Sequence, residues 1–303
     1  MISSAFVATF ALVLSSLFTV HAASLQQITD PNIKNPTNVG FYIYVPDKLA
    51  TKPAIVVAMH YCTGTAEAYY NGSPYASLAD QKGFIVIYPS SPNSGTCWDV
   101  SSNATLSHNG GGDSNAIANF VTWTLNKYSA DATKVFATGT SSGAMMTNVM
   151  AAAYPEMFAA GIAYSGVAAG CFASQWSGVA AWNGTCATGH AQAEPAQWAN
   201  IVRDMYKGYT GKYPRMQIYH GSVDTSIDPN NYNETVKQWA GVFGYPYPAA
   251  NITKNKPQND YETDDFGPRL QGIYATGVGH TVPIHGSDDM AFFGLVSLIP
   301  VEP

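Results

Sequence analysis

Residues 135–153 read VFATGTSSGAMMTNVMAAA. The stretch combines a short apolar strand, a turn of the form Gly-x-Ser-x-Gly centred on Ser141, and a helix that is apolar nearly all round. In this context the serine stands on a sharp strand-to-helix turn, and small flanking residues let the helix approach the strand. The stretch therefore predicts that Ser141 is an exposed nucleophile above a sheet. Ser142 is the neighbouring alternative, but it lies one residue off the centre of the turn, and we assign it a backbone donor role.

Short apolar runs recur on both sides of this stretch and alternate with helical patterns. Continuous rather than alternating apolar runs indicate strands that are covered on both faces, hence a mostly parallel sheet. The alternation predicts an α/β fold in which an open sheet carries helices on both faces. The predicted strands are 41–44, 54–59, 84–88, 135–137, 161–164, 216–219 and 272–275, and the predicted helices are 75–81, 114–128, 143–153, 195–206, 232–243 and 288–298. Ligands of such sheets bind beyond the carboxyl ends of the strands, so we expect the chemistry in the loops that follow them.

A serine nucleophile needs a partner histidine and a carboxylate. The neutral imidazole takes the serine proton, and the carboxylate holds the imidazole in the right tautomer and stabilises its charged form. In this arrangement the chain order is Ser, then Asp or Glu, then His. Asp224 and His280 each lie in a loop after a predicted strand, so we predict them as acid and base, with Asp228 as the alternative acid. His285 lies near a helix start, and His220, at a strand end, is predicted as a structural hydrogen-bonding residue.

A tetrahedral intermediate also needs two N–H donors for its oxyanion. One donor follows the nucleophile, and this predicts the amide of Ser142. The other comes from the loop after an earlier central strand, where the sequence reads His60-Tyr61-Cys62-Thr63-Gly64. We predict the amide of Cys62 as this second donor.

The composition limits the class of protein. The chain has 303 residues, of which 46% are hydrophobic and 11% charged, with 19 Tyr, 13 Phe and 6 Trp, and this excludes a disordered chain. The net charge of −6 disfavours nucleic acid and an anionic membrane as partners and suits a neutral substrate.

The N-terminus predicts secretion. Residues 5–20 are almost wholly apolar or small, and small residues follow at the cleavage positions, as in a signal peptide, although residues 1–22 lack the Lys or Arg of a basic n-region. We therefore expect a signal peptide over 1–22, no membrane span, and one catalytic domain over 23–303. The absence of an internal repeat or tether supports one domain, and we expect it to be a monomer.

Four cysteines in an oxidising compartment predict two disulfides. Three pairings are possible, and we favour the local one, Cys62–Cys97 with Cys171–Cys186. None of the cysteines has the spacing of a zinc site. Acceptor sequons for N-glycosylation begin at Asn71, Asn103, Asn183, Asn233 and Asn251.

Several motifs together resemble the fungal acetyl xylan esterases of carbohydrate esterase family 1. They are His60–Gly64, Cys97-Trp98-Asp99, Gly110-Gly111-Gly112-Asp113-Ser114, Gly139–Thr147 and Gly279-His280. The resemblance covers essentially the whole mature chain. It implies a secreted α/β-hydrolase without metal or cofactor that removes acetyl groups from acetylated xylan or xylo-oligosaccharides, with Ser141, Asp224 and His280 as its triad. Feruloyl esterases share much of the serine motif, so a feruloyl esterase and a non-catalytic carbohydrate-binding module remain alternatives.

Other residues have a binding or a purely structural interpretation. Trp182, in a long insertion after the strand at 161–164, and Trp98 are candidates to stack on sugar faces or to wall a small acyl pocket. Asp113 is predicted to cap the helix that follows it. Asp264 and Asp265 are predicted to lie in a solvated polar loop.

Overall fold

The computed structural model describes residues 23–176 and 178–296, and within them ten strands form one sheet. The strands are β1 (Gln26–Gln27), β2 (Gly40–Tyr44), β3 (Ile55–Met59), β4 (Ile85–Ser90), β5 (Val135–Thr140), β6 (Ala160–Tyr164), β7 (Arg215–Gly221), β8 (Asn251–Lys254), β9 (Tyr261–Gly267) and β10 (Leu270–Ala275). Their order is β1-β2-β4-β3-β5-β6-β7-β10-β9-β8. From β4 to β10 the neighbours in this order are parallel, and both edges of the sheet add antiparallel strands.

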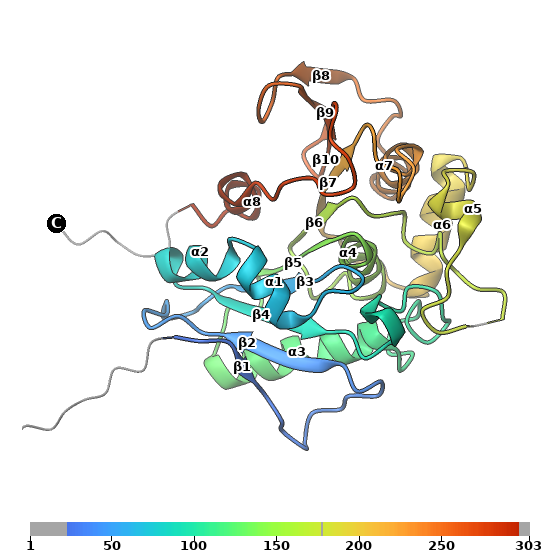
Figure 1. Cartoon of the computed structure of the whole chain (residues 1–303). Helices are drawn as coiled ribbons and strands as arrows, with labels where there is room; N and C mark the ends of the chain where they lie inside the picture. The colour runs from blue at the N-terminus through green and yellow to red at the C-terminus, as the bar shows by residue number, and fades with distance from the viewer. Residues whose placement is uncertain (1–22, 177, 297–303) are drawn as a thin grey trace, which may run out of the picture.

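Helices cover both faces of the sheet (Figure 1). They are α1 (Ala66–Gly72), α2 (Tyr75–Lys82), α3 (Asp113–Tyr128), α4 (Ser142–Ala153), α5 (Gly184–Ala187), α6 (Pro195–Met205), α7 (Asn230–Phe243) and α8 (Gly286–Phe293), with a 3-10 turn, η1, at Ser94–Thr96. The apolar side chains of α1, α2 and α8 pack into one core, and those of α3, α4, α6 and α7 pack into the other. The predicted α/β fold, mostly parallel with helices on both faces, is confirmed.

The continuously apolar strands feed both cores at once. In β3 all five residues are buried, with Ile55, Val57 and Met59 in the core beneath α4 and Val56 and Ala58 in the opposite core. Successive side chains of a strand point to opposite faces, so only a run without polar interruptions can serve two covered faces. This is the pattern from which the parallel sheet was predicted.

The edge beyond β7 differs from the prediction. Asp264 and Asp265 lie in strand β9 rather than in a loop, and the Tyr232 hydroxyl donates a hydrogen bond to Asp264 Oδ2 at 2.6 Å. β9 pairs with β10 on one side and with the edge strand β8 on the other, and the polar residues between its buried positions hide it from a search for apolar runs.

Two helix ends also differ from the prediction. Asp113 does not cap α3, because Gly112 occupies the cap position and Asp113 is the buried first residue of the helix. Its Oδ2 instead accepts hydrogen bonds from the Asn93 side chain and the Asp99 amide, so it holds the preceding loop. Helix α8 ends at Phe293, before the predicted 298, because Gly294 has a φ of 77° that ends the helix.

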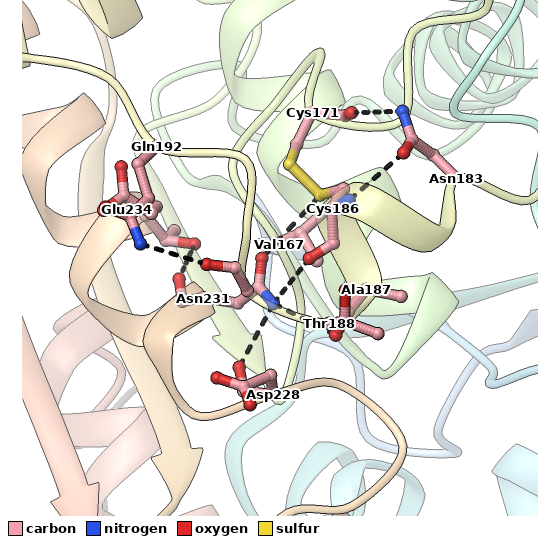
Figure 2. The surroundings of a disulfide bond; sticks show 12 residues. Val167, Cys171, Asn183, Cys186, Ala187, Thr188, Gln192, Asp228, Asn231 and Glu234 are labelled. Atoms are coloured by element: carbon pink, nitrogen blue, oxygen red, sulfur yellow. Dashed lines mark hydrogen bonds between the residues drawn. A yellow bond between two sulfur atoms is a disulfide. The ribbon is translucent and has the colours of Figure 1, made fainter.

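Two disulfides connect segments that follow strands, and Cys186 of the second disulfide lies in α5. Cys62 pairs with Cys97 and Cys171 pairs with Cys186, the two pairs favoured from the sequence. Figure 2 shows the second disulfide beside Asn183, whose side chain donates to the Cys171 carbonyl and accepts from the Cys186 amide. This bridge closes the insertion that carries Trp182.

The predicted signal peptide lies outside the described residues. No helix within residues 23–176 and 178–296 has the length and apolar character that a membrane span requires.

Candidate active site

Ser141 stands at the turn between β5 and α4. Its φ of 56° and ψ of −120° are strained for a residue with a side chain, as expected of a nucleophile on a strand-to-helix turn. A Cβ on Gly143 would overlap the Met59 carbonyl oxygen, and one on Gly139 would lie 2.5 Å from the backbone of Gly143. The two glycines are therefore required because α4 crosses directly over the ends of β3 and β5.

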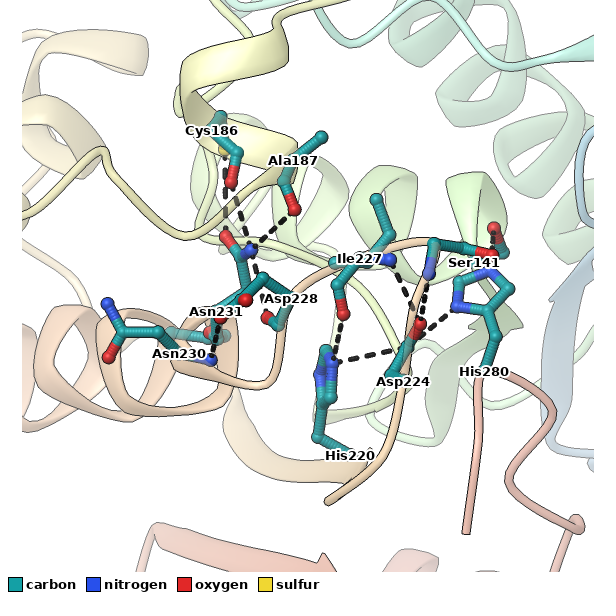
Figure 3. Close-up of polar contacts among 12 residues, drawn as sticks. Ser141, Cys186, Ala187, His220, Asp224, Ile227, Asp228, Asn230, Asn231 and His280 are labelled. Carbon is teal, nitrogen blue, oxygen red and sulfur yellow. Dashed lines mark hydrogen bonds and ion pairs between the residues drawn. The ribbon is translucent and has the colours of Figure 1, made fainter.

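His280 bridges Ser141 and Asp224 (Figure 3). Its Nε2 lies 2.8 Å from Ser141 Oγ, and its Nδ1 lies 2.7 Å from Asp224 Oδ2. An ionised carboxylate only accepts hydrogen bonds, so the ring proton belongs on Nδ1 and leaves Nε2 free to accept the serine proton. The three side chains come from the loops after β5, β7 and β10. Along the chain, Ser141 lies 139 residues before His280, and Asp224 lies 56 residues before it.

Asp224 is held by more than His280. Its Oδ1 accepts hydrogen bonds from the amides of Ser226 at 2.8 Å and Ile227 at 2.9 Å. Burial acts to raise the pKa of Asp224, but the hydrogen bonds from His220, His280 and the Ile227 amide outweigh it, and the pKa lies well below its usual value. Asp224 is therefore a carboxylate throughout the neutral range.

His220 is the second histidine on this carboxylate. Its Nε2 lies 3.3 Å from Asp224 Oδ2 and 3.0 Å from the Ile227 carbonyl oxygen. Both neighbours are acceptors, so Nε2 carries the proton and donates to them. The sequence predicts a hydrogen-bonding role for His220 but does not identify its partners. Asp224 and the Ile227 carbonyl lie beside it because the loop after β7 folds back over the end of the strand.

The alternative residues lie elsewhere. Asp228 Oδ1 accepts a hydrogen bond from the Asn230 amide at the start of α7, at 2.8 Å. His285 stacks on the Tyr219 ring, and its amide donates to the Tyr164 hydroxyl. The arrangement thus favours Asp224 and His280 over both alternatives.

A cavity of about 850 Å³ opens on Ser141 and His280. Cys62 and Ser142, the predicted oxyanion donors, line it together with Ser141. The disulfide to Cys97 and a 2.7 Å hydrogen bond from the Thr63 amide to the Gly95 carbonyl fix the loop that carries Cys62. Backbone amides held in this way need no reorganisation when charge develops on a substrate oxygen.

The two tryptophans differ in their exposure. Trp182 is 64% exposed at the rim of the cavity and packs edge-on against Phe172. Trp98 also lines the cavity but is only 1% exposed, and its Nε1 donates to the His60 carbonyl at 2.8 Å. A sugar cannot stack on a ring buried in this way, so the prediction of stacking on Trp98 is wrong, and only a role as a wall remains for it.

Further lining residues escaped the sequence analysis. They are mainly aromatic and aliphatic side chains from the loops after several strands, from α1 and from α4: Tyr61, Tyr69, Val100, Met145, Phe172, Val282 and Ile284. Only Tyr61 and Met145 lie within quoted motifs, where neither was given a role, and apolar residues of this kind are equally frequent in cores. Their role depends on the tertiary arrangement alone.

The predicted glycosylation residues are mostly accessible. Asn71, Asn103, Asn233 and Asn251 are exposed, whereas Asn183 is partly buried where it caps α5. The first four side chains can therefore be reached from solvent.

Comparison with known proteins identifies a family that the chain matches. Residues 39–252 match the protein family described as Esterase PHB depolymerase. The chain belongs to this family. The matched range includes Ser141 and Asp224, and His280 lies beyond it.

Individual named relatives share about two thirds of their residues with this chain. The chain is 65% identical over 281 residues to a probable acetylxylan esterase A of Aspergillus clavatus, covering 92% of this chain and 91% of the relative. It is 66% identical over 274 residues to the acetylxylan esterase A of Aspergillus awamori, covering 90% of each.

A solved structure agrees with these relatives. The structure of the acetyl xylan esterase from Aspergillus awamori superposes with a TM-score of 0.88 at 66% identity, covering 90% of this chain and 99% of that one. The resemblance to fungal acetyl xylan esterases that the sequence motifs indicated is confirmed, and so is the α/β-hydrolase fold that it implies.

Proposed function

We propose that the chain is a secreted serine esterase that removes O-acetyl groups from acetylated xylan. The single observation that carries the proposal is the continuous hydrogen-bonded chain from Ser141 Oγ through His280 to Asp224, at 2.8 Å and 2.7 Å. The substrate class comes from the acetyl xylan esterases to which the chain is 65% and 66% identical.

The reaction proceeds in two halves. Ser141 Oγ attacks the acetyl carbonyl carbon while its proton passes to His280 Nε2, and Asp224 stabilises the imidazolium. Collapse of the tetrahedral intermediate breaks the ester bond, the sugar oxygen leaves with the proton from His280, and an acetyl-enzyme remains. A water molecule then gives its proton to His280 and attacks the acetyl-enzyme, and acetate leaves as Ser141 regains its proton.

The cavity supplies the remaining parts of the mechanism. The amides of Cys62 and Ser142 stabilise the oxyanion in both halves of the reaction. Trp182 offers an exposed aromatic face to a xylose ring, and Trp98 forms part of the wall near the acyl group. The acceptor of the reaction is water, and no residue of this mechanism requires a cofactor.

The setting of the reaction is also a proposal. We infer that residues 1–22 are a signal peptide and that residues 23–303 form a monomeric catalytic domain in the extracellular space. Two disulfides and five sequons support passage through an oxidising, glycosylating compartment.

The decisive experiment compares acetate release from acetylated xylan by the unaltered chain and by Ser141→Ala. We expect the variant to lose roughly 10⁴-fold or more in kcat while its thermal unfolding is unchanged. Near-normal turnover by the variant would reject Ser141 as the nucleophile. Methyl ferulate, assayed in parallel, should be hydrolysed far more slowly than the acetyl ester, and the reverse preference would favour a feruloyl esterase.

A further inference from the structure

A second groove lies on the sheet away from the catalytic cavity. It has a volume of about 600 Å³ and lies at the amino end of β7, whereas Asp224 follows the carboxyl end of that strand. None of the described residues lines both cavities. The polar residues that line the groove are Arg215, Gln217, Asn251, Asp265, Gln271 and Asp288.

The sheet register aligns four of these side chains in one row. Gln217 of β7 is paired with Gln271 of β10, Gln271 with Asp265 of β9, and Asp265 with Asn251 of β8. Directly paired residues project to the same face of a sheet, and the hydrogen bond from Gln217 Nε2 to Gln271 Oε1, 3.1 Å long, agrees with this. A row of amides and a carboxylate thus crosses the sheet from its interior to its edge, beside α8.

The inner end of the row holds an unsatisfied acceptor. Gln217 is only 5% exposed, and its Oε1 has no hydrogen-bond partner within the described part of the chain. Buried polar atoms are almost always paired, because an unpaired one loses its hydrogen bonds to water without replacement. An amide oxygen at the floor of a polar groove therefore points to a ligand that brings a donor.

The charges of the groove favour a neutral ligand. Arg215 is the one cation among the groove residues, and its guanidinium already donates to the Phe292 carbonyl at 2.8 Å and lies over the Phe292 ring. The carboxylates of Asp265 and Asp288 disfavour an anion. A cation site is not indicated either, because no cluster of three or more His, Cys, Asp or Glu suited to a metal occurs within residues 23–176 and 178–296.

We propose that this groove binds a neutral saccharide. Its hydroxyl groups can donate to Gln217 Oε1 and to the carboxylates and accept from the amide groups of the row, so a chain of hydroxyls matches the mixed donors and acceptors. Two sources supply that chemistry: a xylan chain, which rests on the proposed function, and the core of an N-linked glycan on Asn251, which lies at the outer end of the row in the sequon Asn251-Ile252-Thr253.

The first arm of the test measures xylan binding without turnover. The full chain carries Ser141→Ala and Trp182→Ala, to remove catalysis and weaken the catalytic cavity, and Thr253→Ala, to remove the glycan while Asn251 stays in the row. Affinity electrophoresis in soluble deacetylated xylan should show retardation. Adding Gln217→Leu should weaken binding about 5-fold or more, the effect of losing one hydrogen bond of about 1 kcal/mol, whereas Asp204→Ala, an exposed charge on α6, should not change it.

The second arm tests the glycan. The chain, secreted from a glycosylating host, is mapped by mass spectrometry, and the rate at which an endoglycosidase releases the Asn251 glycan is measured. A glycan core held in the groove should be released several-fold faster in Gln217→Leu than in Asp204→Ala. Thermal unfolding identifies any variant that does not fold, and Asp265→Ala, at the exposed rim, then replaces Gln217→Leu.

The outcomes of the two arms separate the sources. Retardation that depends on Gln217 supports a xylan chain as the ligand. Slow release of the Asn251 glycan that depends on Gln217 supports the glycan as the ligand. The proposal is overturned if neither signal depends on Gln217 or on Asp265. Because the first arm records binding alone, an enzyme without acetyl esterase activity that is still retarded would refute the proposed function and leave the groove intact.

Discussion

His220 Nε2 lies 3.3 Å from Asp224 Oδ2, the same carboxylate oxygen that His280 Nδ1 contacts at 2.7 Å. The two imidazoles therefore share one acceptor from opposite directions, one buried and one at the cavity (Figure 3). His220 is also tied to the Ile227 carbonyl, so it connects the end of β7 to the loop that presents Asp224. We interpret His220 as a positioning residue for the carboxylate.

Replacing His220 with leucine should lower kcat/KM on an acetyl ester by about 10-fold or more. The change removes a hydrogen bond to a charged group, which is worth about 1.5–3 kcal/mol, and leaves the Ile227 carbonyl without this donor. His220→Gln is the matched control, because its amide can still donate, and it should keep more of the activity. Equal activity of the leucine variant and the unaltered enzyme would contradict the positioning role.

The same substitution should make the protein more sensitive to acid. The folded pKa of Asp224 is depressed below the ordinary Asp value, so the carboxylate contributes stability that is present above about pH 4 and is lost as the pH falls through the folded pKa. Without the hydrogen bond from His220 this depression is smaller. Acid unfolding followed by circular dichroism should begin at a higher pH in His220→Leu than in His220→Gln.

Gly143→Ala should destabilise the fold strongly. The added Cβ would overlap the Met59 carbonyl oxygen and approach the His60 carbonyl oxygen at 2.6 Å, and both belong to backbone that cannot rotate away. We expect a loss of about 3 kcal/mol or more in the free energy of unfolding, measured with urea. Gly72→Ala, at the end of α1 with open space around the new Cβ, should change stability by less than about 1 kcal/mol.

The nucleophile turn and the central strands could be predicted because each requirement falls on residues that are close together in the sequence. Gly139 and Gly143 are required by close backbone approach, and the continuous apolar run at 54–59 is required by burial on both faces. The first requirement selects small residues at the turn, and the second selects an uninterrupted apolar run, so both can be recognised in a short stretch of sequence. For the same reason Ser141, Asp224 and His280 could be selected from their places after strands.

The remaining features depend on distant parts of the chain. The polar strand at 261–267 forms because β10 offers it an edge, and nothing in its own composition distinguishes it from a solvated loop. Asp113 faces inward because Asn93 and the Asp99 amide need an acceptor there. Trp98 is buried because the His60 carbonyl accepts its indole N–H.

Asp289 should make stability fall as the pH rises. Burial raises its pKa to about 7, although hydrogen bonds from Tyr164 and Tyr75 act in the opposite direction. Because the folded pKa exceeds the ordinary value of 3.8, its stabilising contribution is complete below about pH 4 and is lost as the pH rises through 7. The loss amounts to about 1.4 kcal/mol for each unit of pKa difference.

Asp289→Asn tests this linkage because asparagine resembles the protonated acid. The difference in unfolding temperature between the variant and the unaltered protein should shift in favour of the variant between pH 5 and pH 8. Asp204→Asn, an exposed position on α6, should show no such trend. A constant difference across this range would show that Asp289 does not titrate there.

Asp99 should control binding of the polysaccharide through the loop that carries Trp182. The carboxylate is buried and accepts hydrogen bonds from the hydroxyls of Ser102 and Thr105 and from the Ala180 amide, 3.0 Å away. Burial acts to raise its pKa, but the hydrogen bonds from the Ser102 hydroxyl and from the amides of Ala180, Ser101 and Ser102 outweigh burial and lower it. Asp99 thus joins the segment after η1 to the rim of the catalytic cavity, 81 residues further on.

Ser101 makes a parallel connection, donating to the Gly178 carbonyl at 2.7 Å and accepting from the Ala181 amide at 2.8 Å. Ser101→Ala should therefore raise KM for acetylated xylan several-fold with a smaller change in kcat, and Asp99→Asn should do so more strongly. Hydrolysis of 4-nitrophenyl acetate, which needs no sugar contact, should be affected less. Thr105→Ala loses a bond to the same carboxylate on the side away from the loop, so it should lower the unfolding temperature without this KM effect. If all three variants change both substrates equally, the loop connection is merely structural and Asp99 has no part in positioning Trp182.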